Sequence, residues 1–235
     1  MRTSSRAGPP RFRTSAGKRP LSFRLESCEQ DVSVDWSLLH SLNDFMAGHD
    51  GVEDVLLFYV EASEALFVAT LFGVFLLARG PGRALWRRAT VAAVLSAGLA
   101  LAVGKLISEL VDRARPFVAD PHGVHLFTPH AADPGFPSDH ATAAFAIAVA
   151  ILLRKRGWGI VALVAATVLS IGRVALGVHY PSDVLSGAAL GATAAFALWW
   201  APLRSRVDAL ADLLGRPVDR VFESGARRLG SRARS

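Results

Sequence analysis

Three short polar clusters interrupt a largely apolar sequence, and each contains residue types that bind or cleave phosphate esters. The clusters are Lys105, Arg113, Arg115 and Pro116; Pro137, Ser138, Asp139 and His140; and Arg173, His179 and Asp183. Ionisable side chains at membrane depth are expensive to bury, so a concentration of them among apolar segments indicates a functional site.

The cationic residues and the proline-serine pair are suited to holding a phosphate group. Pro137 and Ser138 are typical of a helix start, where free backbone N–H groups and the helix dipole attract an anion. Lys105, Arg115 and Arg173 add three positive charges, and an arginine can bind two phosphate oxygens at once. Fixed cations can stabilise a transferring phosphoryl group without a metal, so we expect neither a metal nor a cofactor.

The two histidines and the last aspartate are suited to the chemical step. Asp183 follows His179 by four residues, so its carboxylate can fix the tautomer of that imidazole and leave the other ring nitrogen free as a nucleophile. His140 is then available as the general acid that protonates the leaving group.

Long apolar segments surround these clusters. Half of the chain is hydrophobic (51%) and its mean hydropathy is +0.34, values typical of a membrane-spanning helix bundle. We therefore expect an all-α protein with about five transmembrane helices and an N-terminal interfacial helix. The predicted spans cover about 54–78, 89–111, 138–153, 158–177 and 182–202, and the interfacial helix covers about 35–47.

The positive charge lies at the two ends of the chain. The net charge is +6, of which residues 1–31 and 203–235 carry +4 each, while residues 32–202 carry −2. Anionic lipid headgroups are the simplest partner for such ends, and no nucleic acid is expected. We expect a disordered basic tail over 1–31, a membrane-embedded domain over 32–202, and a basic cytoplasmic tail, partly an amphipathic helix, over 203–235.

Loop charge predicts the orientation of the bundle. Residues 79–88, 154–156 and the segment from 203 onward are basic, and five spans place all three in the cytoplasm. The loop 112–137 and the turn 177–182 then share the outer face, and with them all three polar clusters.

In combination, the clusters resemble the type 2 phosphatidic acid phosphatase superfamily. The pattern of that family is a Lys followed by Arg-Pro, then Pro-Ser-x-His, then Arg-x5-His-x3-Asp, and the resemblance covers roughly residues 35–202. It implies His179 as nucleophile, His140 as general acid, Asp183 as the orienting carboxylate, and Lys105, Arg115, Ser138 and Arg173 as phosphate ligands.

Three departures from the common pattern narrow the resemblance. Nine residues separate Lys105 from Arg115 instead of six, Asp139 replaces a glycine, and Gly172 stands where a serine usually precedes Arg173. With the opening segment 42–48, these features resemble the bacitracin-resistance branch, whose members are undecaprenyl-diphosphate phosphatases of the bacterial envelope. The resemblance implies a lipid phosphate or diphosphate substrate, a multi-pass protein of the bacterial plasma membrane, an extracytoplasmic site, and no obligate protein partner.

Several of these residues also have ordinary structural interpretations. Lys105 could be a lysine that extends from a helix end to the membrane surface, and Arg113 and Arg115 could be charges that flank a span. Ser138 is a helix cap in either interpretation. Asp139 is favoured as a first-turn partner of the helix dipole over a catalytic acid.

Two other groups of polar residues have more than one interpretation. The loop residues His122, His125, His130 and Asp133 could suggest a metal site, but their spacing fits no ligand motif, which favours solvated or substrate-adjacent histidines. Glu61 and Glu64 lie inside the first predicted span, where a carboxylate needs a partner or a wet surface. We hypothesise that at least one faces the bundle interior near Lys105 or the substrate entry.

Three functions are compatible with the sequence. The first is an undecaprenyl-diphosphate phosphatase, the second a phosphatidic acid or phosphatidylglycerophosphate phosphatase with the same site, and the third a non-catalytic phospholipid-binding membrane protein. Intact residues at 140, 179 and 183 argue against the third, and the apolar helix faces do not distinguish the first two.

Overall fold

The computed structural model describes the backbone of residues 21–232 and the side chains of residues 33–222. The chain divides into two units, residues 1–34 and 35–235, and the second contains the bundle and the polar clusters. The prediction for residues 1–20 lies outside the described residues.

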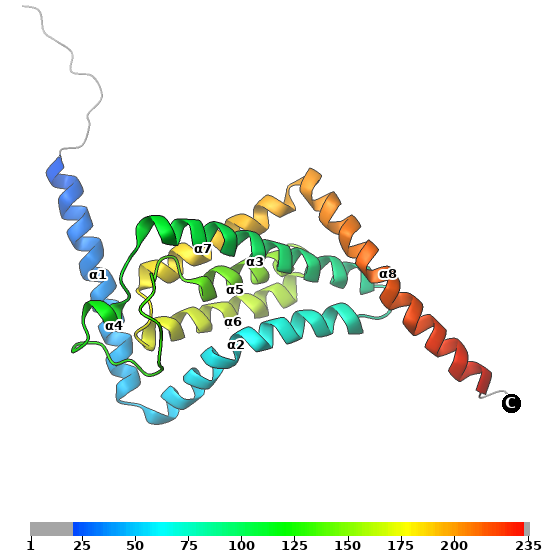
Figure 1. Ribbon diagram of the computed structural model, residues 1–235, viewed down its shortest axis with the longest axis horizontal. Coiled ribbons are helices and arrows are strands. Elements are labelled where there is room, and N and C mark those ends of the chain that lie inside the picture. The colour runs from blue at the N-terminus through cyan, green and yellow to red at the C-terminus, as the bar shows by residue number, and fades with distance from the viewer. Residues whose placement is uncertain (1–20, 233–235) are drawn as a thin grey trace, which may run out of the picture. The chain divides into compact units, whose positions relative to one another are not determined.

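Every regular element in the described part of the chain is a helix, which confirms the predicted all-α class (Figure 1). The helices are α1 (Leu21–Ala47), α2 (Asp50–Leu77), α3 (Arg83–Val111), α4 (Pro116–Ala119), α5 (Asp139–Leu152), α6 (Arg156–Ala175), α7 (Pro181–Trp199) and α8 (Ala201–Arg232). The five long predicted segments therefore become α2, α3, α5, α6 and α7, with boundaries within a few residues of those expected.

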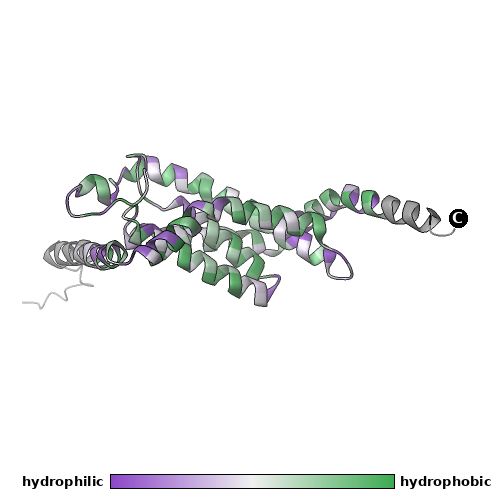
Figure 2. Cartoon of the chain, turned by 90° about the horizontal axis from the view of Figure 1, so that it is seen from below, coloured by the Kyte–Doolittle hydropathy of each residue, from purple (hydrophilic) through white to green (hydrophobic). Residues whose placement is uncertain are grey.

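Four of these helices, not five, are long and apolar enough to cross a membrane within the described residues: α2, α3, α6 and α7. The exception is α5, whose 14 residues rise only about 21 Å, less than the roughly 30 Å of a hydrocarbon core. It packs against α3, α6 and α7, and its apolar side chains are buried by protein. Figure 2 shows apolar residues along the bundle helices, with polar residues mainly towards their ends.

Helix α5 approaches α7 closely because α7 presents glycines to it. A Cβ at Gly187 would stand 2.6 Å from the carbonyl oxygen of Ser138, and a Cβ at Gly191 would stand 2.3 Å from that of Thr142. Glycines four residues apart let two helix backbones approach in a membrane protein. This packing fixes the first turn of α5, which carries Ser138 and His140.

The predicted interfacial helix is present but begins earlier than expected. Helix α1 starts at Leu21, so the described backbone is helical over residues 21–31, part of the segment that was expected to be a disordered tail. No proline or glycine lies between Leu21 and Ala47, so little opposes extension of the helix beyond its amphipathic part. Of the apolar residues that predicted this helix, Leu39 and Met46 are buried by protein, whereas Leu38 and Phe45 are about half exposed.

As far as its side chains are described, the C-terminal segment is a helix that packs against the bundle. Val207 and Ala211 of α8 belong to the main apolar core. Its aspartates pair with arginines of the basic segments: Asp208 with Arg154 at 3.0 Å, Asp212 with Arg88 at 2.6 Å, and Asp219 with Arg87 at 2.9 Å. The three segments predicted to share a side are therefore in contact, at the end of the bundle opposite α4 (Figure 1).

Replacement of Gly191 by alanine should destabilise the bundle, because the new Cβ would also lie 2.7 Å from the backbone nitrogen of Ala146. Overpacking of this kind costs about 1–3 kcal/mol or more, so the midpoint of thermal unfolding in detergent should fall by several degrees. Gly98→Ala is the matched control, since a Cβ at Gly98 meets nothing within 4 Å. Equal midpoints for the two variants would contradict close packing of α5 on α7.

Candidate active site

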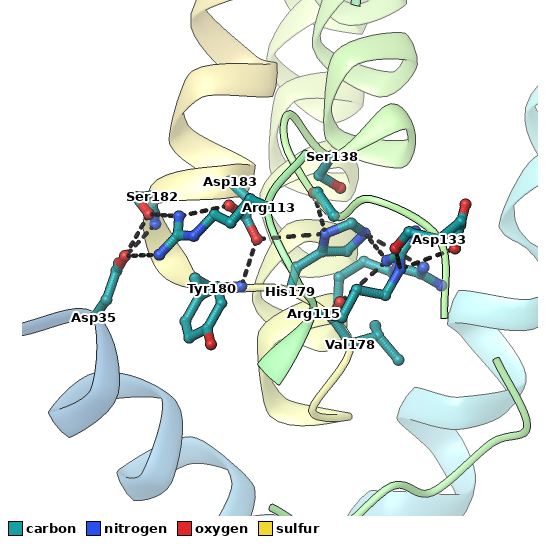
Figure 3. A network of polar contacts seen from close by, with 12 residues as sticks. Asp35, Arg113, Arg115, Asp133, Ser138, Val178, His179, Tyr180, Ser182 and Asp183 are labelled. Atoms are coloured by element: carbon teal, nitrogen blue, oxygen red, sulfur yellow. Dashed lines mark hydrogen bonds and ion pairs between the residues drawn. The ribbon is translucent and has the colours of Figure 1, made fainter. Parts of the chain in front are cut away.

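The three polar clusters converge at the end of the bundle formed by α4 and residues 35–47 of α1 (Figures 1 and 3). The chain reaches this end at the C-termini of α3 and α6 and at the N-termini of α5 and α7. His179 lies at the centre, in the turn between α6 and α7, and is 2% exposed. Gly177 makes that turn with φ of +77°, a conformation that an L side chain rarely adopts.

Both ring nitrogens of His179 have defined neighbours. Nδ1 lies 3.0 Å from the carbonyl oxygen of Gly135 and 3.7 Å from Oδ2 of Asp183. Because both neighbours are acceptors, Nδ1 carries the proton. The predicted orienting role of Asp183 is therefore shared with Gly135, whose carbonyl makes the shorter contact.

The other nitrogen, Nε2, faces two guanidinium groups. Nη1 of Arg115 lies 3.2 Å away and Nη2 of Arg173 lies 3.5 Å away. Since guanidinium groups only donate, Nε2 is the unprotonated nitrogen. Burial, then the charges of Arg173 and Arg115, hold the pKa of His179 well below its ordinary value, so the imidazole stays neutral at neutral pH.

The two arginines are buried with little negative charge to balance them. Arg115 donates to the carbonyl oxygen and to Oδ1 of Asp133, both at 3.1 Å, but the Asp133 side chain is 57% exposed and its charge is screened by solvent. Arg173 donates to Nε2 of His130 at 2.7 Å, and its Nε has no hydrogen-bond partner in the described part of the chain.

His130 is neutral in this setting. Burial, followed by the charges of Arg115 and Arg173, lowers its pKa to about 4. Its ring stacks with that of Phe117 of α4, at 6.4 Å between centroids. His130 thus occupies, as a neutral acceptor, a position that a phosphate oxygen could take on Arg173.

Ser138 is the predicted phosphate ligand at the start of α5. It is the N-cap residue of α5 and fully buried, yet its Oγ has no hydrogen-bond partner among the described residues. Buried hydroxyl groups without a partner are rare, and an N-terminus offers further N–H donors beside this one. Unpaired donors on Ser138 and Arg173 near His179 form a site that an oxyanion would satisfy.

An apolar cavity opens next to this cluster. His140 is half-buried and lines a cavity of about 250 Å³, where Glu64 and Asp139 are the other charged residues and nearly all remaining lining residues are apolar. A larger cavity of about 490 Å³ adjoins it, sharing Ser63, Phe67, Leu71 and Ile147. Glu64 lines the smaller cavity, whereas Glu61 accepts a hydrogen bond from Thr128 at 3.1 Å, so the hypothesis of a carboxylate near the substrate entry stays a prediction for Glu64.

Two of the predicted cations lie outside the cluster. Lys105 is 72% exposed on α3, with Nζ 4.0 Å from Glu109, so its role as a phosphate ligand stays a prediction. Arg113 contacts Asp183, Asp35 and Ser182 and belongs to a second network described below.

Several residues at the site were not assigned from the sequence. Asp35 and the carbonyl of Gly135 belong to no motif, and His130 was predicted only as one of several solvated or substrate-adjacent loop histidines. Within residues 33–222, no three metal-ligating side chains converge. Asn43, part of the opening segment that the resemblance used, binds the carbonyls of His125 and Ala175, both at 2.9 Å, and so ties the loop to the end of α6.

The departure at residue 172 has a packing explanation. A Cβ at Gly172 would stand 2.7 Å from Val60 and 3.2 Å from Leu56, both on α2. The close approach of α2 to α6 therefore leaves no room for the serine that is usual at this position.

Residues 89–206 match the PAP2 superfamily. The chain belongs to this superfamily. It is a multi-pass membrane phosphatase of the PAP2 type, a hydrolase, which confirms the family that the motifs indicated.

Among relatives, the chain is 35% identical to undecaprenyl-diphosphatase BcrC of Bacillus subtilis, over 60% of this chain and 70% of that protein. It is 36% identical to the bacitracin transport permease protein BcrC of Bacillus licheniformis, over 59% and 68%. The PAP2-type phosphatidylglycerolphosphate phosphatase of Bacillus subtilis shares the fold with a TM-score of 0.51, at 20% identity over 76% of this chain and 90% of that one.

Replacement of Ser138 by alanine should weaken product inhibition by inorganic phosphate about tenfold or more. A hydrogen bond to a charged group contributes about 1.5–3 kcal/mol, and each 1.4 kcal/mol is a factor of ten. The measurement is the inhibition constant of phosphate for the purified enzyme. Ser96→Ala is the control, because Ser96 of α3 is equally buried with an unpaired Oγ in the described structure. The same inhibition constant in both variants would remove Ser138 from the anion site.

Proposed function

We propose that this PAP2 phosphatase hydrolyses undecaprenyl diphosphate to undecaprenyl phosphate and inorganic phosphate through a phosphohistidine on His179. The observation that supports the mechanism most directly is the geometry of Nε2 of His179. This nitrogen is unprotonated, and its lone pair faces the guanidinium groups of Arg115 and Arg173. The relatives named above support the choice of substrate.

In the first step, Nε2 of His179 attacks the terminal phosphorus. The Nε2–P bond forms while the bond from phosphorus to the bridging oxygen breaks, and the leaving lipid phosphate takes a proton from His140. Burial and the charge of Arg173 lower the pKa of His140 to about 3, so in this mechanism the negative charge of the bound diphosphate raises that pKa and His140 takes up its proton with the substrate. Arg115, Arg173 and Ser138 donate to the oxygens of the transferring group, where charge is concentrated in the transition state. The Nδ1 contacts to Gly135 and Asp183 stabilise the positive charge that the imidazole acquires.

In the second step, a water molecule cleaves the phosphohistidine. His140, now neutral, accepts a proton from the water as the P–O bond forms and the Nε2–P bond breaks. Inorganic phosphate leaves, and both histidines return to their starting protonation states. No step requires a group other than these side chains and water.

The cavities support a lipid substrate. A phosphate at Ser138 and His179 places the attached chain next to His140, where the apolar cavity between α2, α3 and α5 begins. Its lining suits an isoprenoid or an acyl chain equally, so phosphatidic acid and phosphatidylglycerophosphate are the second candidate substrates. The intact geometry around His179 disfavours a non-catalytic lipid-binding protein.

The active site faces the outside of the plasma membrane in this proposal. The catalytic end carries α4 and the loop, whereas α8 and the arginines it binds lie at the other end. Basic segments remain on the cytoplasmic side of bacterial membrane proteins. The enzyme would then recycle a carrier lipid on the outer leaflet.

The leaving group tests both the substrate and the roles of the histidines. Phosphate release should be fastest from undecaprenyl diphosphate, compared with phosphatidic acid and phosphatidylglycerophosphate at equal surface concentration. His140→Ala should slow formation of the phosphoenzyme by about 10²–10⁴-fold with phosphatidic acid, which expels an alkoxide, and much less with a nitrophenyl phosphate.

His179→Ala should abolish turnover of every substrate in that series together with the acid-labile phosphoenzyme. Phosphate trapped on any other residue, or an equal slowing of phosphoenzyme formation by His140→Ala with all leaving groups, would contradict the assigned roles. A higher kcat/KM for a phosphomonoester lipid would contradict the substrate alone.

Cysteine labelling tests the orientation. With Cys28 replaced by serine, His122→Cys in the exposed loop should react with an impermeant maleimide on intact cells. Ser205→Cys, exposed at the α8 end, should react only after lysis. The reverse pattern would place the active site in the cytoplasm and exclude the carrier-recycling role.

A further inference from the structure

A second polar network lies behind His179, on the side away from the anion site (Figure 3). Arg113, in the segment after α3, stands between two carboxylates. Its Nη1 donates to Oδ1 of Asp183 at 2.7 Å, and its Nη2 donates to Oδ2 of Asp35 at 2.8 Å. The guanidinium group also lies 4.0 Å from the ring centroid of Tyr180. These contacts commit Arg113 to Asp183, not to a phosphate.

The other carboxylate, Asp35 of α1, is bound to the start of α7. Its Oδ1 accepts the backbone N–H of Ser182 at 2.9 Å, and its Oδ2 accepts the Ser182 hydroxyl. An acidic group at the first turn of a helix satisfies free N–H groups and interacts favourably with the helix dipole. Asp35 therefore fixes the turn of α7 that carries Asp183, in addition to binding Arg113.

Asp183 depends on these neighbours because it is fully buried. Its Oδ2 accepts the backbone N–H of Tyr180 at 2.9 Å, and its Oδ1 has Arg113 as its cation. A buried carboxylate without a cation is strongly destabilising, and it can lower its energy by taking up a proton. A protonated Asp183 would no longer stabilise an imidazolium at His179.

We propose that Asp35 and Arg113 are a positioning pair, which keeps Asp183 ionised and oriented behind His179 and so couples α1 to the catalytic histidine. Neither residue touches the substrate. The pair rests on the proposed function of His179, but its effect on turnover can be measured whether or not a covalent intermediate forms.

The pair has a kinetic signature that differs from that of a phosphate ligand. Asp35→Asn and Arg113→Gln should each lower kcat by about 10- to 100-fold, the range for loss of an outer hydrogen-bond partner of a functional histidine. The KM and the inhibition constant of inorganic phosphate should change by less than about twofold, because the anion site is intact. The double variant should be no slower than the worse single variant, since the two residues act as one unit.

Matched variants separate positioning from general damage. Asp44→Asn makes the same change at an exposed residue of the same helix, and Arg83→Gln removes a partly exposed arginine at the other end of the bundle. Both should keep wild-type kcat. If Asp35→Asn does not fold, Arg113→Lys provides the test. Lysine keeps the positive charge but cannot bridge two carboxylates, so kcat should fall while thermal stability stays close to wild type.

Two outcomes would overturn the proposal. The first is a folded Asp35→Asn or Arg113→Lys enzyme with kcat within twofold of wild type. The second is a raised KM and weaker phosphate inhibition with unchanged kcat, which would make Arg113 a substrate ligand. A wild-type enzyme that forms no phosphohistidine would instead contradict the proposed mechanism and leave the kcat comparison valid.

Discussion

The burial of two guanidinium groups against a neutral imidazole is the constraint on which this active site depends. Arg115 pairs with one carboxylate, that of the solvent-exposed Asp133. The side chains that hydrogen-bond to Arg173 in the described structure are the neutral histidines His130 and His179. Desolvated cations without anions are costly, and that cost falls when an oxyanion enters between them. In the proposed mechanism, this unbalanced charge is held in place before the substrate arrives and supplies the energy of phosphate binding, which is the preorganisation that transition-state stabilisation requires.

The surrounding residues at this end of the bundle hold the two arginines close together and keep them buried. Gly187 and Gly191 let α7 approach α5 closely, and Ser138 at the start of α5 is fully buried. Asn43 binds both the loop and the last turn of α6, and Gly177 lets the chain turn directly into His179. Each of these contacts fixes the backbone close to His179, and together they set the position of its buried side chain.

The motif spacing could bring Ser138, His179 and Asp183 together because these residues lie at helix ends. Ser138 follows a proline at the N-cap position of α5, and Asp183 lies in the first turn of α7, four residues after His179. Asp35 and His130 could not be predicted in this way, because they reach the site from segments distant in sequence. Lys105 and Arg113 were grouped with Arg115 by sequence alone, yet side-chain direction at the end of α3 separates the three. The short length of α5 was also missed, since an alanine-rich helix buried by protein and one buried by lipid have the same composition.

The two ends of the bundle contain similar cations with opposite surroundings. At the α8 end, Arg87, Arg88 and Arg154 each meet an aspartate of α8, so their charge is neutralised within the protein. At the other end, Arg113 is neutralised by Asp183 and Asp35, whereas Arg115 and Arg173 are not fully balanced. Arginine content alone therefore does not identify the proposed phosphate site; what distinguishes it, among the described residues, is the absence of matching buried carboxylates. The same criterion separates Arg113 from Arg115, two residues apart in the sequence, and supports the proposal that Arg113 positions Asp183 while Arg115 binds the substrate.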